Sequence, residues 1–269
     1  MIFKRVFLEK DNENVYLDAY VADPLSDFTR KAILVIPGGA YWDVCSDREG
    51  EPIAMAFMAQ GYNAFVLHYS VSRKKKFPAQ LIEASLAMKH IKENAKEYNI
   101  DPEKVFATGF SAGGHLAGSL GLMWNKKEIY DAVEMPYGYN KPAGMMLVYP
   151  VVSSNPEYGH LPSFYNLLCN STPEAEELKE CSLEQQVSAD AVPLFLVHTS
   201  NDDLVDVRNS LCLAEKYREN GLQFELHVYP DAPHGVALGN AITRCGVEKW
   251  DNKSIAKWVE NAVAWADSL

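Results

Sequence analysis

The sequence predicts an α/β protein with a mostly parallel central sheet and helices on both faces. Apolar runs such as KAILVIPGG (31–39) show no polar alternation, which is typical of strands buried on both faces. Stretches with helical periodicity alternate with these runs along the chain, as in parallel sheets with crossover helices. No internal repeat or linker divides the 269 residues, so we expect a single domain over 1–269.

The elements follow one another in a regular order. Two antiparallel strands open the chain, VFLEK and NVYLDAYVAD, around a DNEN turn. Further strands are expected at 31–39, 62–70, 104–110, 143–152, 192–200 and 223–230. Helices are expected at 48–61, from Pro78 to about residue 98, after Ser111, at about 207–220 and from about 252. The segment of about 153–190 is too long for a plain connection, and we expect it to form a short cap or lid insertion.

Composition excludes several classes of function. The net charge is −11, and SRKKKF (72–77) is the strongest basic cluster, so nucleic-acid binding is not expected. No apolar run approaches the length of a membrane span, and the N-terminus lacks a signal-peptide pattern. Five cysteines without a C-x-x-C pair fit reduced thiols, so we expect a cytoplasmic protein. The oligomeric state is not predictable from these features.

A glycine-rich turn around Ser111 carries the chemistry. Residues 109–113 read Gly-Phe-Ser-Ala-Gly, directly after an expected strand and before an expected helix. Small residues let the backbone turn sharply, so that the serine stands exposed at the tip and acts as a nucleophile. The alternative is a glycine-rich strand–helix turn with a passive serine. The strand and helix on either side favour the nucleophile.

A serine hydroxyl needs a base, and His234 is the candidate. It lies in YPDAPHGVAL, just after the expected strand at 223–230, and ligands of parallel sheets bind at such strand ends. His115 follows the serine by one helical turn and is expected to point along the buried helix. His160, in the 153–190 segment, is expected to contact substrate. The remaining histidines lie on expected strands or helices and are interpreted as structural.

The base needs an acid that fixes its tautomer, and Asp202 is the candidate. HTSNDDLVDV (198–207) follows a strand and offers three carboxylates, of which Asp202 comes first. The run DDLVD also resembles a magnesium-binding pattern, but such patterns lie on long helices, and no metal site is expected. Asp206 is an alternative helix cap, and Asp231 is interpreted as a turn residue.

Acyl transfer also needs donors for the oxyanion. VIPGGAYW (35–42) ends the first long parallel strand, and its glycines let backbone N–H groups approach a ligand. We expect Gly39, Ala40 and Ala112 to supply these donors, the alternative being an ordinary Gly-Gly turn. Beside them, Tyr41 and Trp42 are expected to line the substrate site, although packing of the loop would explain two aromatic residues at these positions equally well.

These phrases together resemble the α/β-hydrolase superfamily over essentially the whole chain. The resemblance is closest to hormone-sensitive-lipase-like and acetyl-xylan-esterase-like carboxylesterases, through VIPGGAYW, SDREGEPIAMAF, FPAQLIEASLAMKHI, GFSAGGHLAGSLG and HTSNDDLVDV. It implies an α/β-hydrolase fold, a triad of Ser111, Asp202 and His234, and no metal or organic cofactor. Two departures stand out. Pro37 replaces the histidine of the usual His-Gly-Gly-Gly, and Phe110 replaces the aspartate of lipase-like members, which favours the acetyl-esterase group.

Three functions follow as hypotheses. The first is a serine carboxylesterase that removes short acyl groups, acetyl above all, from xylan-derived or other sugar oligomers. Tyr158, Phe164 and Tyr165 of the 153–190 segment are further candidates for sugar contacts. The second is an amide-cleaving hydrolase of the same fold, a prolyl-oligopeptidase-like peptidase or an arylformamidase. The third is a non-catalytic binding protein, which the presence of all three triad residue types disfavours.

Overall fold

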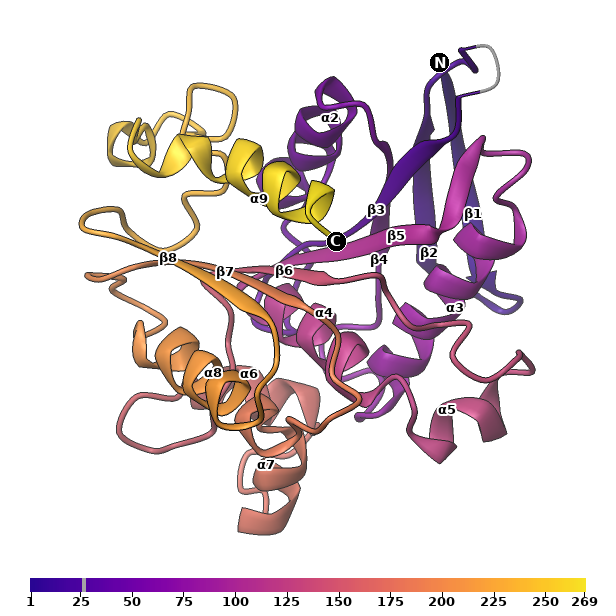
Figure 1. Ribbon diagram of the computed structural model, residues 1–269. Helices are drawn as coiled ribbons and strands as arrows, with labels where there is room; N and C mark the ends of the chain where they lie inside the picture. Colours follow the sequence, from indigo (N-terminus) through magenta and orange to yellow (C-terminus); the bar gives the residue numbers. More distant parts are fainter. Residues whose placement is uncertain (26–27) are drawn as a thin grey trace.

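The computed structural model describes residues 1–25 and 28–269 and has a central sheet between two helical layers (Figure 1). The sheet order is β1-β2-β4-β3-β5-β6-β7-β8; β1 and β2 are antiparallel to their neighbours, and all the other pairs are parallel. The strands are β1 (Ile2–Glu9), β2 (Asn12–Val21), β3 (Arg30–Ile36), β4 (Asn63–His68), β5 (Ile100–Phe110), β6 (Met145–Val148), β7 (Leu194–Thr199) and β8 (Phe224–Tyr229). The predicted fold class is confirmed.

The two helical layers cover opposite faces of the sheet. Helices α1 (Ser46–Glu49), α2 (Glu51–Ala59) and α9 (Trp258–Asp267) belong to one layer, and α3 (Ala79–Glu93), α4 (Ser111–Met123) and α8 (Arg208–Glu219) to the other (Figure 1). Each layer has its own apolar core, because the strands between them present buried side chains to both faces. Among the residues that the structure describes, no helix is long and apolar enough to cross a membrane.

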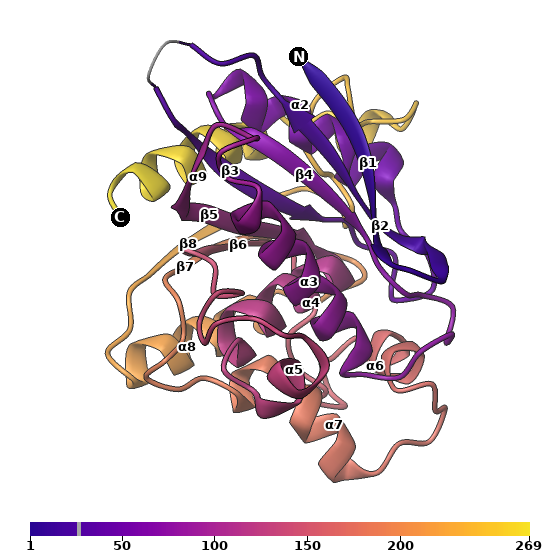
Figure 2. The ribbon, with the colours of Figure 1, turned by 90° about the vertical axis from the view of Figure 1, so that its right-hand side faces the viewer.

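The segment 153–190 is more regular than the sequence predicts. It contains α6 (Leu161–Leu167), α7 (Ala175–Cys181) and a 3-10 turn, Leu183–Gln185. Pro162 occupies the first turn of α6, and Glu174 and Glu177 form a capping box at α7. Together with α5 (Lys127–Ala132), these helices extend the layer of α3 and α4 (Figure 2).

Two helix boundaries differ from the prediction. The expected helix at 48–61 is split at Gly50, whose backbone leaves the helical region, and Pro52 lies in the first turn of the second piece, α2. The last helix begins at Trp258 instead of about 252. Asn252 accepts the backbone N–H groups of Ser254 and Ile255, and this local turn takes the place of the first helical turn.

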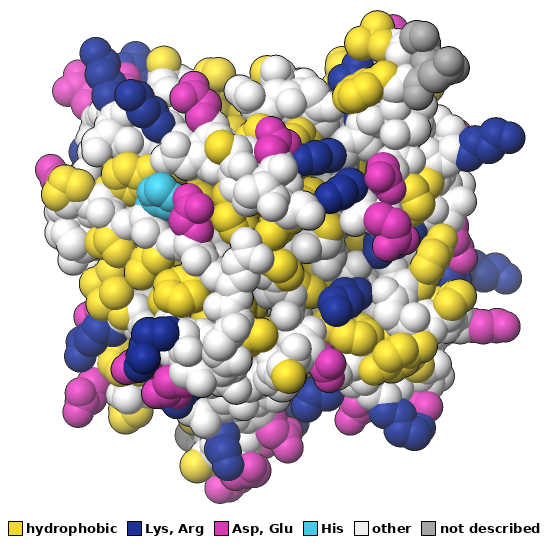
Figure 3. All heavy atoms as spheres, viewed as in Figure 1, with side chains coloured by type: hydrophobic (Ala, Val, Ile, Leu, Met, Phe, Trp, Pro, Cys, Tyr) yellow, Lys and Arg dark blue, Asp and Glu magenta, His cyan; other side chains and the backbone are white. Residues whose placement is uncertain are grey.

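Charge on the visible face of the molecule is mixed. Lys and Arg side chains are interspersed with Asp and Glu side chains there, without a broad area of one sign (Figure 3). Such a face does not provide the continuous positive potential that binding a phosphate backbone needs.

Candidate active site

The turn from β5 to α4 is as sharp as the glycine-rich motif predicts. Phe110 ends the strand and Ser111 begins the helix, with a φ of 52° at the serine. A non-glycine residue rarely adopts such a φ, and residues that do are concentrated at functional sites. A Cβ atom at Gly113 would lie 2.2 Å from the carbonyl oxygen of Ile36, so only glycine lets the helix approach β3 this closely.

The structure brings Ser111, His234 and Asp202 together from the ends of β5, β8 and β7. The Ser111 Oγ lies 2.9 Å from His234 Nε2, and His234 Nδ1 lies 2.8 Å from Asp202 Oδ2. Because the carboxylate only accepts hydrogen bonds, Nδ1 carries the proton and Nε2 is free to accept the serine proton. Ser111 is 8% exposed, so the hydroxyl reaches the surface within a largely desolvated site.

Asp202 is held as an anion by several donors. Its Oδ1 accepts the backbone N–H groups of Leu204 and Val205, at 3.0 and 2.9 Å. Burial alone would raise the pKa of this carboxyl, but the hydrogen bond from His234 and the ring of His198, whose Nε2 lies 3.5 Å from Asp202 Oδ2, hold the pKa well below its usual range. His198 is itself fixed by Ser210 Oγ and the Val205 carbonyl, which explains this buried histidine as structural support for the acid.

The loop after β3 lies directly against the serine. A Cβ atom at Gly38 would lie 3.0 Å from Ser111 Cβ, so the loop backbone passes beside the hydroxyl. Gly39 and the two residues after it have φ values of 127°, 54° and 56°. Within residues 1–25 and 28–269, no backbone hydrogen bond uses the N–H of Gly39 or Ala40. Ala112 is in the first turn of α4, where backbone N–H groups have no acceptor within the helix.

Four side chains hold this loop, and sequence reasoning singled out none of these contacts. Glu49 Oε2 accepts the Gly38 N–H at 2.8 Å, and the Tyr69 hydroxyl donates to the Pro37 carbonyl at 2.8 Å. The remaining two contacts are Asn166 Nδ2 to the Ala40 carbonyl and the Tyr41 hydroxyl to His115 Nδ1. The loop therefore keeps its shape without the histidine that Pro37 replaces. Glu49 belongs to the quoted SDREGEP phrase, but nothing in the sequence indicates what it touches.

The residues predicted to bind substrate have different environments. Trp42, at the end of the loop after β3, is 59% exposed, and Tyr165 is half-buried on α6. His160 is half-buried, donates to or accepts from Ser163 Oγ at 2.9 Å, and has a pKa lowered by burial and by the nearby His234. Tyr41 is only 1% exposed, with its hydroxyl bound to His115. This burial argues against the predicted substrate contact of Tyr41, which packs in the core instead.

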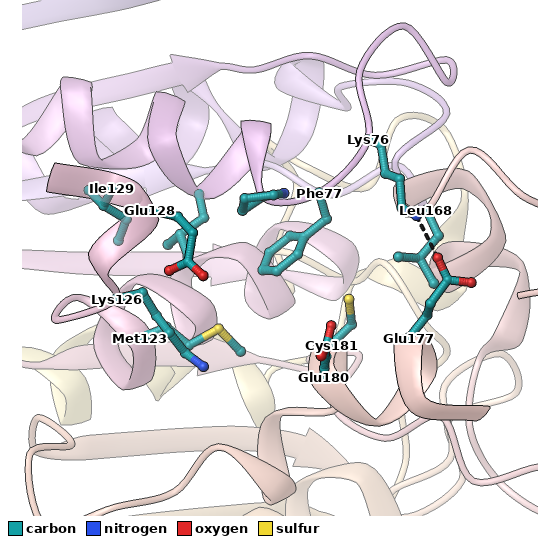
Figure 4. A pocket seen from close by; sticks show the side chains of 12 residues that line it. Lys76, Phe77, Met123, Lys126, Glu128, Ile129, Leu168, Glu177, Glu180 and Cys181 are labelled. Carbon is teal, nitrogen blue, oxygen red and sulfur yellow. Dashed lines mark hydrogen bonds and ion pairs between the residues drawn. The ribbon is translucent and has the colours of Figure 1, made fainter. Parts of the chain in front are cut away.

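A pocket of about 230 Å³ lies elsewhere, between α3, α4, α5 and α7 (Figure 4). Its floor is apolar, with Phe77, Met123 and Leu168, and its rim is charged, with Lys76 paired to Glu177. None of its lining residues belongs to the serine–histidine–aspartate cluster or to the oxyanion loop. Across the described ranges there is also no group of three metal-ligating side chains placed to hold an ion.

Comparison with known proteins shows the family to which the chain belongs. The BD-FAE family model matches residues 17–217, and the chain belongs to this family of α/β hydrolases. The chain is 38% identical over 222 residues to an endo-1,4-beta-xylanase B of Butyrivibrio fibrisolvens, covering 80% of this chain and 34% of that protein. It is 29% identical over 213 residues to an acetylxylan esterase of Xylanibacter ruminicola, covering 78% and 42%. The chain thus spans less than half the length of these two relatives.

A solved structure is similar over almost the full length. The acetyl ester-xyloside bifunctional hydrolase from Caldicellulosiruptor lactoaceticus is 33% identical, with a TM-score of 0.79 over 97% of this chain and 96% of that one. The likeness therefore includes the 153–190 segment and the strand ends that carry the three polar side chains.

Proposed function

We propose that this protein is a serine carboxylesterase with Ser111 as nucleophile, His234 as general base and Asp202 as the acid that orients it. The observation that carries the proposal is the continuous hydrogen-bonded row of Ser111 Oγ, the His234 ring and Asp202 Oδ2, at 2.9 and 2.8 Å. A hydroxyl becomes nucleophilic when a positioned base takes its proton, and this row provides that base.

The reaction proceeds in two halves. Ser111 Oγ adds to the ester carbonyl carbon while His234 Nε2 takes the hydroxyl proton, and the carbonyl oxygen becomes an oxyanion. The N–H groups of Gly39, Ala40 and Ala112 receive this charge, aided by the positive end of α4. His234 then gives its proton to the leaving alcohol, and an acyl-enzyme remains. Water, deprotonated by the same imidazole, releases the carboxylic acid and restores Ser111.

We assign the substrate to short acyl esters of sugars, with acetyl as the acyl group and xylan-derived oligomers as the first candidates. The names of the xylanase and esterase relatives support this class. The exposed ring of Trp42 offers a flat apolar face of the kind on which sugar rings pack. His160 of the 153–190 segment lies near His234, and we expect Tyr165 to contribute from the same segment, which we interpret as a cap over the sugar side of the site. The cytoplasmic location stays a prediction.

The test is a substrate panel with and without a serine-directed organophosphate. The panel contains p-nitrophenyl acetate, acetylated xylo-oligomers, an aminoacyl-proline amide and N-formylkynurenine. We expect turnover of the two esters, loss of turnover after treatment with the organophosphate, and a covalent label on Ser111 by peptide mass spectrometry. Preference for either amide would replace the esterase proposal with the amide-cleaving alternative. A stable label on another residue, with Ser111 unmodified, would remove Ser111 from the mechanism.

A further inference from the structure

A second buried carboxylate lies beside the catalytic serine, and the acyl-transfer steps do not use it. Glu49, at the end of α1, is 2% exposed. Its Oε2 accepts the Gly38 N–H at 2.8 Å, and its Oε1 accepts the Tyr149 hydroxyl at 2.9 Å. Arg48 Nε is 4.0 Å from Oε1. Burying a carboxylate costs free energy unless hydrogen-bond donors surround it. The Glu49 carboxylate has a donor on each oxygen, and its burial beside the serine therefore calls for an explanation.

The first partner of Glu49 belongs to the oxyanion loop. Gly38 packs between the carboxylate and the nucleophile: a Cβ atom there would lie 2.7 Å from Glu49 Oε2 and 3.0 Å from Ser111 Cβ. The hydrogen bond from its N–H fixes the peptide plane that precedes Gly39 and Ala40. Since consecutive peptide planes share a Cα atom, this contact limits the directions in which the next two N–H groups point.

The second partner leads to the base. Tyr149 directly follows β6, with a φ of 38°, and its hydroxyl accepts the Ala237 N–H at 3.0 Å. Its ring packs edge-on against the His234 ring, with centroids 4.8 Å apart. The Glu49 carboxylate therefore connects, through one intervening hydroxyl, the loop that offers the oxyanion donors and the loop that carries the histidine.

We propose that Glu49 is a positioning residue that holds the oxyanion donors and the His234 loop in register for the tetrahedral intermediate. This inference rests on the proposed esterase function and deepens it. The pKa of Glu49 is raised by burial, and Arg48, His234, the Gly38 N–H and the Tyr149 hydroxyl offset part of this rise.

The test uses three variants and two measurements. Glu49→Gln keeps the shape, but an amide has one acceptor oxygen and cannot accept from both Gly38 and Tyr149. Tyr149→Phe removes only the hydroxyl link and keeps the ring beside His234. Glu51→Gln is the matched control, because Glu51 is exposed at the start of α2. The first measurement is kcat and KM on p-nitrophenyl acetate. The second is affinity for an aryl trifluoromethyl ketone, which accepts the serine oxygen at its carbonyl carbon and forms a tetrahedral oxyanion.

We expect Glu49→Gln to lower kcat by roughly 10- to 100-fold with KM changed less than about threefold, because the lost contact matters most when charge develops. Affinity for the ketone should fall by the same factor as kcat/KM. Tyr149→Phe should show a smaller parallel loss, and Glu51→Gln none. If Glu49 only stabilised the fold, the substitution would lower the melting temperature and the amount of active protein, and the losses of kcat/KM and of ketone affinity would not run in parallel.

Specific outcomes overturn the inference. A folded Glu49→Gln protein with kcat within about twofold of wild type contradicts it, and so does a loss of kcat/KM with unchanged ketone affinity. If Glu49→Gln fails to fold, Tyr149→Phe decides by the same two measurements. Wild-type protein is assayed alongside. Absence of its ester turnover and of its Ser111 label counts against the proposed function, whereas normal wild-type activity with unaffected variants counts against Glu49 alone.

Discussion

The two halves of the site are built on different principles. In the triad half, three side chains from the ends of β5, β7 and β8 contact one another directly. In the oxyanion half, the groups that we propose to bind the oxyanion are backbone N–H groups, and the side chains around them only hold the loop. The first half is defined by which residues are present. The second is defined by backbone geometry. Four hydrogen bonds maintain that geometry, and they are made by Glu49, Tyr69, Asn166 and the Tyr41–His115 pair.

This difference predicts how each half responds to substitution. Removing a triad side chain removes a chemical step, so the loss is large and concentrated in one residue. Removing one support of the loop leaves the other supports in place, so the loss is smaller and shared among several residues.

The largest effect is expected for Ser111→Ala. Without the nucleophile no acyl-enzyme forms, and kcat should fall by roughly 10⁴- to 10⁶-fold. Circular dichroism and the melting temperature should stay close to wild type, because the substitution removes one hydroxyl group and leaves the backbone and the packing around it in place. Near-full ester turnover by this variant, after exclusion of a contaminating esterase, would mean that the catalyst is another residue.

The next largest effect is expected for Asp202→Asn. An amide can donate to His234 Nδ1, which moves the ring proton to Nε2 and blocks acceptance of the serine proton; kcat should fall by roughly 10³- to 10⁴-fold. Asp203→Asn is the matched control. Asp203 is the neighbouring carboxylate and is largely exposed. Its Oδ1 accepts a hydrogen bond from the backbone N–H of His234 at 3.3 Å, and it makes no hydrogen bond to the ring. Equal losses in both variants would contradict the assignment of Asp202.

A moderate effect is expected for Asn166→Ala in the oxyanion half. This removes the 2.9 Å hydrogen bond to the Ala40 carbonyl, and one net hydrogen bond corresponds to roughly a 3- to 10-fold change in kcat/KM. Arg73→Ala removes the guanidinium that donates to Asn166 Oδ1 at the surface and should change the rate less. A loss for Asn166→Ala as large as that for Asp202→Asn would remove the distinction between the two halves.

The last prediction concerns the stability of the fold and its dependence on pH, and not a change in rate. Burial lowers the pKa of His115 to about 4, below the value near 6.5 expected in the unfolded chain. The folded state then binds fewer protons than the unfolded chain between these pH values. The neutral ring therefore makes its whole contribution to the free energy of unfolding above about pH 6.5, and this contribution, about 3 kcal/mol in total, is lost as the pH falls towards 4. Urea unfolding at pH 7 and pH 5 should show a shallower pH dependence for His115→Gln than for wild type. An unchanged dependence would contradict the neutral buried imidazole.

Much of the fold and the triad half could be predicted from sequence. Buried strands and amphipathic helices leave periodic patterns, and the strand-end rule selects Asp202 and His234 as candidates because their positions follow β7 and β8 directly. Ser111 is marked by glycines that the sharp turn requires. These features are local, so a short stretch of sequence contains them.

The rest depends on contacts between distant segments. Glu49 lies 11 residues from Gly38 and 100 from Tyr149, and Asn166 lies 126 residues from Ala40, so no local pattern relates them. Tyr41 has the expected sequence position for a substrate wall, but its ring turns inward because His115 offers it a buried partner. The sequence predicts too early a start for α9, because the side chain of Asn252 accepts a backbone N–H and forms a local turn where the apolar pattern allows a helical one.

The hydrogen bond made by His115 Nε2 bears on how new substrate specificities arise. This nitrogen donates to the carbonyl oxygen of Cys181, at the end of α7, at 2.7 Å. The acceptor is a main-chain atom, so the anchor survives whatever side chain stands at position 181. Natural divergence, or a designer exchanging loops between relatives, can therefore change the residues of the 153–190 segment that we propose as sugar contacts, while the attachment of this segment to α4 stays the same.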